Sequence, residues 1–227
     1  IIEAENGEEG INKALDAIPD IIISDIMMPV KDGIHLSYVL KNDERTSHIP
    51  IILLTAKSGE ENELTGLKAG ADSYMVKPFR EEKLRVVMER LLATRESIRE
   101  KLNKQVIFKP QEIELTSADS QLLTRIKQIL DINLTDPQFN TNLFCEQVGL
   151  SRMHLHRKLK ALTGLSTSEF LRTHRLKTAA KLLENGEANI SEVGYAVGFN
   201  QPAYFSTAFK QHFGCSPSEF IKTKKVL

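Results

Sequence analysis

The 227-residue sequence contains no tryptophan, only two cysteines, and no apolar run near the ~20 residues that a bilayer span requires. Cys145 and Cys215 stand far apart without metal-ligand spacing, which favours two reduced thiols in a cytosolic protein. The sequence shows no signal peptide. These absences exclude disulfide-rich and membrane-spanning classes, and the 41% hydrophobic content is that of a globular protein long enough for two domains.

The net charge of zero conceals an uneven distribution. Residues 1–95 hold 17 Asp and Glu against 12 Lys and Arg, whereas residues 116–227 hold 9 against 14, with four of the six histidines. An acidic first half and a basic second half indicate two domains with different partners, although an excess of five charges also arises by chance.

The first 95 residues alternate short apolar strands with helices. Strands are expected at 1–4, 21–24, 49–56 and 73–79, and helices at 8–18, 34–41, 60–69 and 80–92. Near-continuous apolar strands indicate an α/β fold with a parallel sheet covered on both faces. Functional groups of such sheets gather at the carboxyl ends of the strands.

Asp25, Thr55 and Lys77 stand at three of these strand ends. A carboxylate beside a hydroxyl and an ammonium is suited to accept a phosphoryl group, because the carboxylate attacks phosphorus and the cation neutralises its oxygens. Each residue also has an ordinary structural explanation, as a helix cap, a strand-end hydroxyl and a solvated cation. The combination of all three favours the reactive site.

The segments DIMMPVKDG (25–33), TA (55–56) and GADSYMVKPF (70–79) resemble receiver domains of response regulators. The resemblance implies a flavodoxin-like parallel sheet, Asp25 as phosphoacceptor and Lys77 as the partner of a phosphoryl oxygen. Thr55 and Tyr74 would form a switch pair, and Met27 would offer its backbone carbonyl to Mg²⁺. The Lys77–Pro78 bond is expected to be cis, which proline makes accessible.

Receivers begin with a strand that ends in an acidic pair, and this pair holds most of the Mg²⁺. The sequence begins at what looks like the second strand, so the resemblance implies a receiver over residues 1–95 without its first strand and helix. Mg²⁺ binding should then be weakened, because this hard cation requires oxygen ligands. Residues 96–118 are expected to be a linker whose start extends the last helix and whose Thr116 or Ser117 caps the next.

Residues 119–227 contain an internal repeat. LTGLSTSEF (162–170) matches HFGCSPSEF (212–220) at an offset of 50 residues. Each copy predicts a helix-turn-helix around a glycine, Gly149 or Gly198, and a helix at 169–186 joins the copies. Two recognition helices ~34 Å apart can enter successive major grooves of DNA. A basic helix is often only a solvated surface, but two joined copies favour an all-α DNA-binding domain.

The candidate DNA contacts lie outside the apolar stripes of the two recognition helices. The first set is Arg152, Met153, His156, Arg157 and Lys160, and the second is Ala203, Tyr204, Ser206, Thr207 and Lys210. Arginine reads guanine bidentately, whereas lysine mostly meets phosphate.

This half of the sequence resembles AraC/XylS-type DNA-binding domains. The resemblance implies base reading by Met153, His156 and Arg157 in the first groove. In the second groove it implies Pro202, Ala203 and Thr207. Because these three cannot donate from a long side chain, second-groove readout should be weaker or shape-based.

The two resemblances together predict a non-enzymatic transcription regulator, phosphorylated by a histidine kinase and bound to double-stranded DNA as a homodimer. The linker resembles that of hybrid two-component sensors, which predicts a cytoplasmic segment of a parent protein anchored in the inner membrane. An alternative is a phosphorylation-independent DNA-binding protein whose receiver is only an interaction platform. An enzyme acting on a small phosphorylated substrate is disfavoured, because DIMMP lacks a second carboxylate after Asp25 and no cap domain is present.

Overall fold

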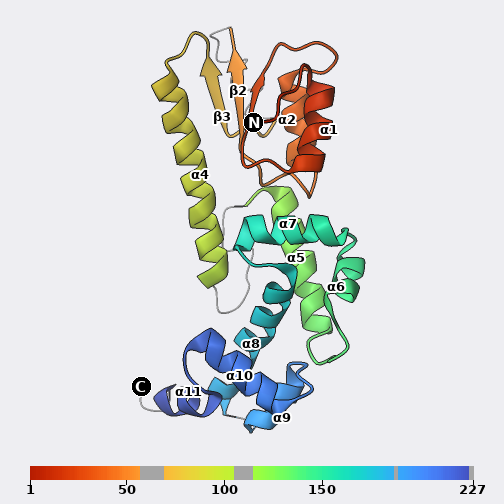
Figure 1. Cartoon of the computed structure of the whole chain (residues 1–227), viewed down its shortest axis with the longest axis vertical. Helices are drawn as coiled ribbons and strands as arrows, with labels where there is room; N and C mark the ends of the chain where they lie inside the picture. The colour runs from red at the N-terminus through yellow and green to blue at the C-terminus, as the bar shows by residue number, and fades with distance from the viewer. Residues whose placement is uncertain (57–68, 105–114, 187–188, 225–227) are drawn as a thin grey trace. The chain divides into compact units, whose positions relative to one another are not determined.

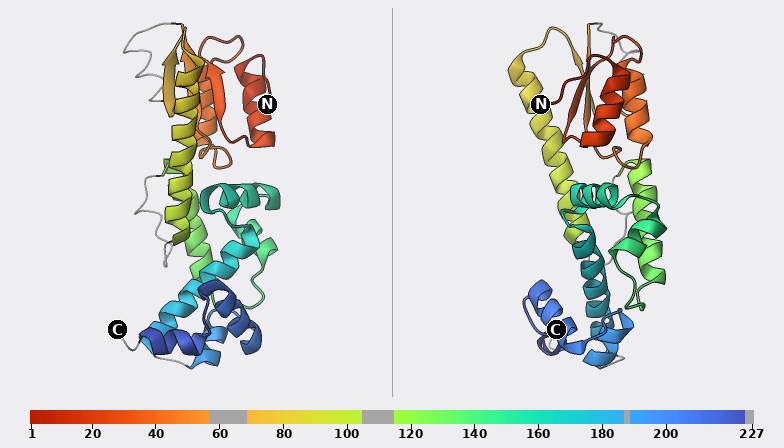
Figure 2. Two further views of the ribbon diagram at one scale, coloured as in Figure 1. Left: turned by 60° about the vertical axis from the view of Figure 1, so that its left-hand side comes forward. Right: turned by 45° about the vertical axis from the view of Figure 1, so that its right-hand side comes forward.

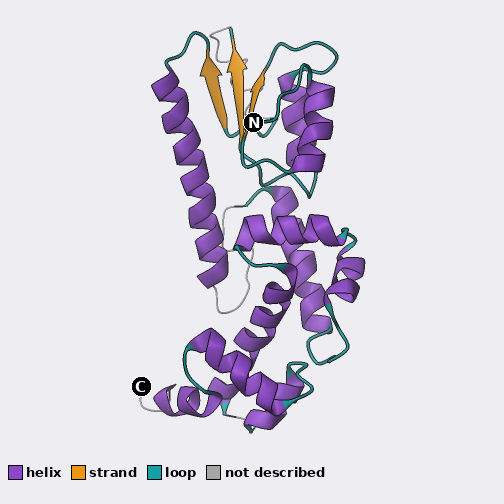
Figure 3. Cartoon of the chain, viewed as in Figure 1, coloured by secondary structure: helices purple, strands orange, loops and turns teal. Residues whose placement is uncertain are grey.

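The protein is described here by a computed structural model, which covers residues 1–56, 69–104, 115–186 and 189–224. The chain divides into two compact units, residues 1–101 with 111–122, and residues 102–110 with 123–227. Figure 3 shows that the strands belong to the first unit and that the second unit is built from helices. Among the described helices, none is both long and apolar enough to cross a membrane.

The first unit is organised around a parallel sheet of three strands in the order β1-β2-β3. The strands are β1 (Ile22–Asp25), β2 (Ile51–Thr55) and β3 (Ser73–Val76). The central strand β2 carries Ile51, Ile52 and Leu53, which are fully buried. A strand with neighbours on both edges and cover on both faces requires a continuous apolar run, as the sequence indicated.

Helices α1 (Gly7–Ala17) and α2 (Gly33–Asn42) pack together against one face of this sheet, as Figure 1 and the right-hand view of Figure 2 show. Each helix begins with a side-chain cap, because the oxygens of Asn6 and Asp32 accept backbone N–H groups of the first turn. Helix α4 (Glu81–Lys104) follows β3. The core between the helices and the sheet is Ile11, Ala14, Leu36, Leu40, Ile51, Leu53 and Ala71.

Most elements expected in the first half are confirmed, including the extension of the last helix and the cis bond at Lys77–Pro78. The strand expected at 1–4 is wrong. These residues form no strand, because an apolar segment without a neighbouring strand has no partners for its backbone N–H and C=O groups. The side chains of Ile1 and Ile2 are exposed. The strand expected at 73–79 ends at Val76, before a proline that cannot donate to the ladder. The helix expected at 60–69 falls almost entirely outside the described residues.

The helical part of the chain confirms both predicted helix-turn-helix motifs and the helix that joins them. Its elements are α5 (Ser117–Ile132), α6 (Thr141–Val148), α7 (Arg152–Thr163), α8 (Thr167–Asn185), α9 (Ile190–Ala196), α10 (Pro202–Phe213) and α11 (Pro217–Lys224). Thr116 accepts from the backbone N–H of Asp119, so it caps α5 as expected. Gly149 and Gly198 occupy the turns with positive φ angles of 79° and 80°, a conformation that glycine adopts without strain.

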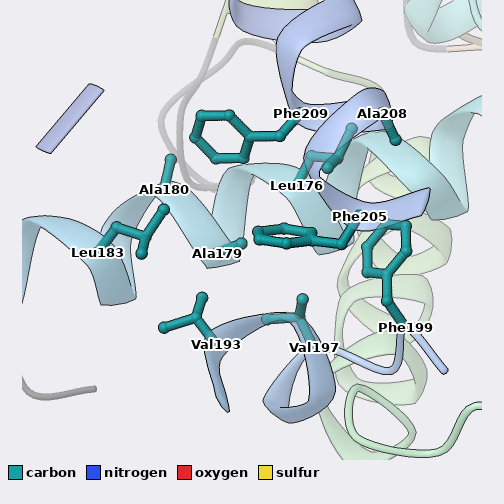
Figure 4. Packing of buried hydrophobic residues seen from close by; sticks show 10 residues of the cluster. All are labelled: Leu176, Ala179, Ala180, Leu183, Val193, Val197, Phe199, Phe205, Ala208 and Phe209. Atoms are coloured by element: carbon teal, nitrogen blue, oxygen red, sulfur yellow. The ribbon is translucent and has the colours of Figure 1, made fainter. Parts of the chain in front are cut away.

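The second motif packs on α8, as Figure 4 shows. The rings of Phe205 and Phe209 are fully buried and meet edge to face with centroids 5.7 Å apart. The rest of this cluster is Leu176, Ala179, Ala180, Leu183, Val193, Val197, Phe199 and Ala208. Helix α8 therefore supplies one wall of the second motif's core as well as joining the two copies.

In each copy of the repeat, the matching sequence contains the end of one helix and the start of the next. Gly164 and Gly214 end α7 and α10 with φ angles of 75° and 77°. Two residues later, Ser166 and Ser216 exchange hydrogen bonds with the glutamates three positions on, which is a capping box at the start of α8 and α11. The serine and the glutamate that recur three positions apart in both copies are thus explained by helix initiation.

Candidate functional site

The carboxyl end of the parallel sheet brings Asp25 and Lys77 into direct contact. Asp25 is the last residue of β1, and its Oδ2 accepts a hydrogen bond from Lys77 Nζ at 2.6 Å. The side chains are 37% and 41% exposed, so the ion pair is open to solvent and to a small solute.

The sheet itself positions the pair. Beyond β1, the N–H of Ile26 donates to the carbonyl of Leu54 at 2.8 Å, and beyond β3 the N–H of Lys77 donates to the carbonyl of Thr55 at 2.7 Å. Asp25 and Lys77 therefore flank the same end of β2 from opposite sides. The expectation that residues far apart in sequence meet at this edge is confirmed for these two side chains.

Gly33 lies directly against the backbone carbonyl of Asp25. The N–H of Gly33 donates to the carbonyl of Ile26 at 3.0 Å, which folds residues 26–33 back against the end of β1. A Cβ on Gly33 would lie 2.2 Å from the carbonyl oxygen of Asp25, far inside van der Waals contact. This glycine was not among the predicted site residues, although the Asp-Gly pair of the motif is a turn signal that pointed to it.

Thr55 and Tyr74 lie in the adjoining strands. Thr55 ends β2 and is buried, and Tyr74 lies opposite Leu53, two residues before Thr55. Because side chains on a strand alternate between faces, Tyr74 and Thr55 share one face of the sheet. Tyr74 is half-buried against the core beneath α1 and α2. Their assignment as a switch pair stays a prediction.

The arrangement suits an incoming anion and offers few protein ligands to a magnesium ion. A carboxylate with an ammonium at hydrogen-bond distance provides a nucleophile and a fixed positive charge for the oxygens of a phosphoryl group. Asp25 and the carbonyl of the exposed Met27 would supply two oxygen donors to Mg²⁺, and water would have to complete its octahedral coordination. Within the described ranges, no group of three or more His, Cys, Asp or Glu side chains could hold a metal ion.

The first helix-turn-helix motif presents most of its predicted contact residues to solvent. Ser151 caps α7 by accepting from the N–H of His154, and the apolar stripe of Leu155, Leu159 and Leu162 faces the core. Among the predicted DNA contacts, Arg152, Met153, His156 and Lys160 are exposed and Arg157 is half-buried. Lys158 is only 1% exposed, so this charge does not belong to the outer surface of the helix.

The second motif presents a less charged surface. Helix α10 begins with Pro202 in its first turn. Ala203, Tyr204, Thr207 and Lys210 are exposed, and Ser206 is half-buried. The hydroxyl of Thr207 donates to the carbonyl of Ala203 at 3.0 Å, which occupies its one donor within the helix. Tyr204 stacks obliquely on Phe199 with ring centroids 5.8 Å apart. The charge available for phosphate contacts is therefore concentrated on α7.

Known protein families match both units. The response regulator receiver domain family matches residues 1–89, and a helix-turn-helix domain family matches residues 144–223. The chain contains a receiver domain followed by an AraC-type helix-turn-helix domain. In the receiver domain, the Asp25–Lys77 pair lies within the matched range, and both recognition helices lie within the matched range of the helix-turn-helix domain.

Individual relatives cover different parts of the chain. Histidine kinase P4 of Formosa agariphila is 39% identical over 220 residues, which are 97% of this chain and 16% of that protein. The transcriptional regulatory protein ResD of Bacillus subtilis is 50% identical over 88 residues, 38% of this chain and 35% of that one. A solved C-terminal domain of AraT, a response regulator from Geobacillus stearothermophilus, shares 30% identity with a TM-score of 0.42 and covers 45% of this chain and 84% of that domain. The chain thus spans well under half the length of both curated relatives.

Proposed function

We propose that the chain is a phosphorylation-dependent transcription regulator in which a phosphoryl group on Asp25 tunes DNA binding by the helix-turn-helix domain. The observation that carries the proposal is the 2.6 Å contact between Asp25 Oδ2 and Lys77 Nζ at an exposed sheet edge. In the same chain, the exposed cations of α7 provide a surface for a polyanion.

The proposed phosphorylation is a transfer from a histidine kinase. A carboxylate oxygen of Asp25 attacks phosphorus, the phosphorus–nitrogen bond of the phosphohistidine breaks, and the leaving imidazole takes up a proton. The product is an acyl phosphate on Asp25, and the ammonium of Lys77 exchanges its carboxylate partner for a phosphoryl oxygen. In this proposal Thr55 and Tyr74 respond to the new charge from the neighbouring strands.

The proposed DNA complex places α7 and α10 in successive major grooves of a duplex. Base reading is assigned to Met153, His156 and Arg157 on α7. Phosphate contacts are assigned to Arg152 and Lys160, and on α10 to Lys210. The second groove would be read through Ala203, Tyr204, Ser206 and Thr207, where contact with base methyl groups and DNA shape matters more than charge.

The proposal extends to the parent protein. The match along 97% of this chain to a part of a histidine kinase supports the origin of the chain as the output end of a hybrid two-component sensor. We assign residues 1–95 to the receiver, 96–118 to the linker and 119–227 to the DNA-binding domain, acting as a homodimer in the cytoplasm, where the DNA is. The parent would be anchored in the inner membrane.

The test measures phosphorylation and DNA binding on the same protein. The chain, Asp25→Asn and a control with another exposed carboxylate changed, Asp20→Asn, are incubated with acetyl phosphate and Mg²⁺, and intact mass reports the added phosphoryl group. Fluorescence anisotropy on a duplex selected from a random pool then gives affinity across a salt series. We expect tighter binding after phosphorylation in the wild type and in Asp20→Asn, and no change in Asp25→Asn.

The alternative function gives a different result. If the receiver domain serves only as an interaction platform, acetyl phosphate will leave both mass and affinity unchanged while binding still weakens steeply with salt. If the selection yields no duplex that the chain binds, both functions are wrong.

A further inference from the structure

The connection between α5 and α6, residues 133–140, contacts both helix-turn-helix motifs. Leu134 packs against the core of the second motif, beside the cluster drawn in Figure 4. Phe139 is buried against Phe144 of the first motif, with ring centroids 6.0 Å apart. Asn133 Nδ2 donates to Gln147 Oε1 on α6 at 2.9 Å. One short segment is therefore fixed to both motifs.

Arg175, on helix α8, binds the backbone of this segment. Its Nη2 donates to the carbonyl of Asp136 at 2.7 Å and to the carbonyl of Phe139 at 3.2 Å. These are bonds between a side chain and two backbone oxygens about 40 positions earlier in the chain. Both bonds come from one guanidinium nitrogen, whose N–H directions are fixed by the planar group, whereas the three donors of a lysine ammonium rotate.

The turn of the second motif closes on the same point. A Cβ on Gly198 would lie 2.6 Å from the carbonyl oxygen of Leu134 and 3.0 Å from Cζ and Nη2 of Arg175. Only a residue without a side chain allows this approach, and its φ of 80° also favours glycine. The turn of the second motif, the α5–α6 connection and α8 thus meet at Arg175.

Burial of the Arg175 guanidinium costs hydration free energy, which indicates that the role of this residue is to direct hydrogen bonds. Nε of Arg175 is buried without a hydrogen-bond partner among the described atoms, and burial lowers the pKa of the side chain, an effect that the charge of Asp136 opposes. An apolar residue would fill the same space without losing hydration. The charged side chain instead provides directed bonds to the connection.

We propose that Arg175 is a positioning residue that fixes the separation and rotation of α7 and α10, and thereby the spacing of the two DNA boxes that the domain accepts. The inference deepens the proposed function and rests on it. Adding one base pair between two boxes moves the second by about 3.4 Å and turns it by about a tenth of a helical turn. If the two motifs are held rigidly, α10 cannot move to reach the displaced box. If they are free to move relative to each other, α10 can reach it, but binding then costs the entropy of ordering the two motifs.

The test compares the full chain with Arg175→Met, which keeps the bulk of the side chain and removes its donors. Arg172→Met is the matched control, because it removes the same charge from an exposed position on the same helix. Anisotropy measures affinity for the selected duplex and for duplexes with one base pair added or removed between the boxes. We expect the wild type and Arg172→Met to lose about tenfold or more on respaced duplexes, and Arg175→Met to lose less than about threefold.

Arg175→Lys covers the case in which the methionine variant fails to fold by circular dichroism. It keeps the charge and a single donor nitrogen without the fixed geometry, so its loss on respaced duplexes should fall between those of the wild type and Arg175→Met. The proposal is overturned if the folded Arg175 variants bind every duplex more weakly by the same factor, with spacing preference unchanged, or bind as the wild type does. A wild type that binds no duplex overturns the proposed function itself, and a wild type that binds equally at all spacings overturns only the role of Arg175.

Discussion

Protonation of His174 should destabilise the helix-turn-helix domain in mildly acidic solution. His174 lies on α8 with its side chain 13% exposed, and its Nε2 is 3.5 Å from Asp131 Oδ1 on α5. Burial lowers the pKa of His174 from 6.5 to about 4. Asp131 opposes this effect, while the positive charges of Lys127, Arg175 and Lys177 add to it. The folded domain therefore holds this imidazole in its neutral form.

The pH window follows from the direction of the shift. Because the folded-state pKa lies below the unfolded value, the stabilisation is fully present above pH 6.5 and is lost as pH falls towards about 4. For pKa values of 6.5 unfolded and about 4 folded, linkage gives a loss of about 2 kcal/mol between neutral pH and pH 5. The complete loss below pH 4 is about 3 kcal/mol, a large part of the stability of a typical domain.

Urea unfolding followed by circular dichroism at pH 7 and pH 5 measures this loss. The comparison of wild type with His174→Gln isolates the one imidazole, because all other titrating groups are common to the two proteins. We expect the wild type to lose about 2 kcal/mol more than the variant on acidification. A control, His35→Gln at an exposed position of the receiver domain, should behave as the wild type. Equal losses in wild type and His174→Gln would refute the reasoning.

Three further substitutions test the packing and the DNA surface. Gly33→Ala should destabilise the receiver domain by about 3 kcal/mol in chemical unfolding, because the added Cβ meets the carbonyl oxygen of Asp25; unchanged stability would contradict the close approach. Phe205→Ala should cost about 3–5 kcal/mol, since it empties the centre of the second motif's core; a loss below 1 kcal/mol would mean that this core is loosely packed. Lys160→Ala should weaken binding to all duplexes alike and lower the salt slope by about 1, whereas a change in sequence preference would assign Lys160 to a base.

The positions of Asp25 and Lys77 could be predicted because a parallel sheet places all carboxyl strand ends on one edge. The sequence could not show whether each apolar segment has a neighbouring strand in the sheet. The segment at 1–4 has strand-like composition but forms no strand, since a ladder needs a partner. The need for glycine at position 33 is likewise set by a backbone oxygen eight residues away, which appears in no hydrophobic pattern.

In the helical half, local signals predicted several helix boundaries. Ser151, Pro202 and Gly186 each act where their capping preferences placed them. The role of Arg175 was not foreseen, because its acceptors are backbone carbonyls of Asp136 and Phe139 and carbonyls have no residue-type signature. Lys158 was not among the predicted DNA contacts, and its burial agrees with its place between Leu155 and Leu162 on the same stripe.

The paired helix boundaries of the repeat affect the order in which parts of the chain fold. Each recognition helix is ended by a glycine, and the next helix is begun by a serine and a glutamate, all within six positions of one another. Such boundaries depend on near neighbours, and contacts of short sequence separation form quickly. The sheet must instead bring Ile22 to Ile51, with α2 between them in the sequence, before β1 gains its partner. On dilution from denaturant, helices α7, α8 and α10 should therefore regain hydrogen-exchange protection before the strands of the receiver domain.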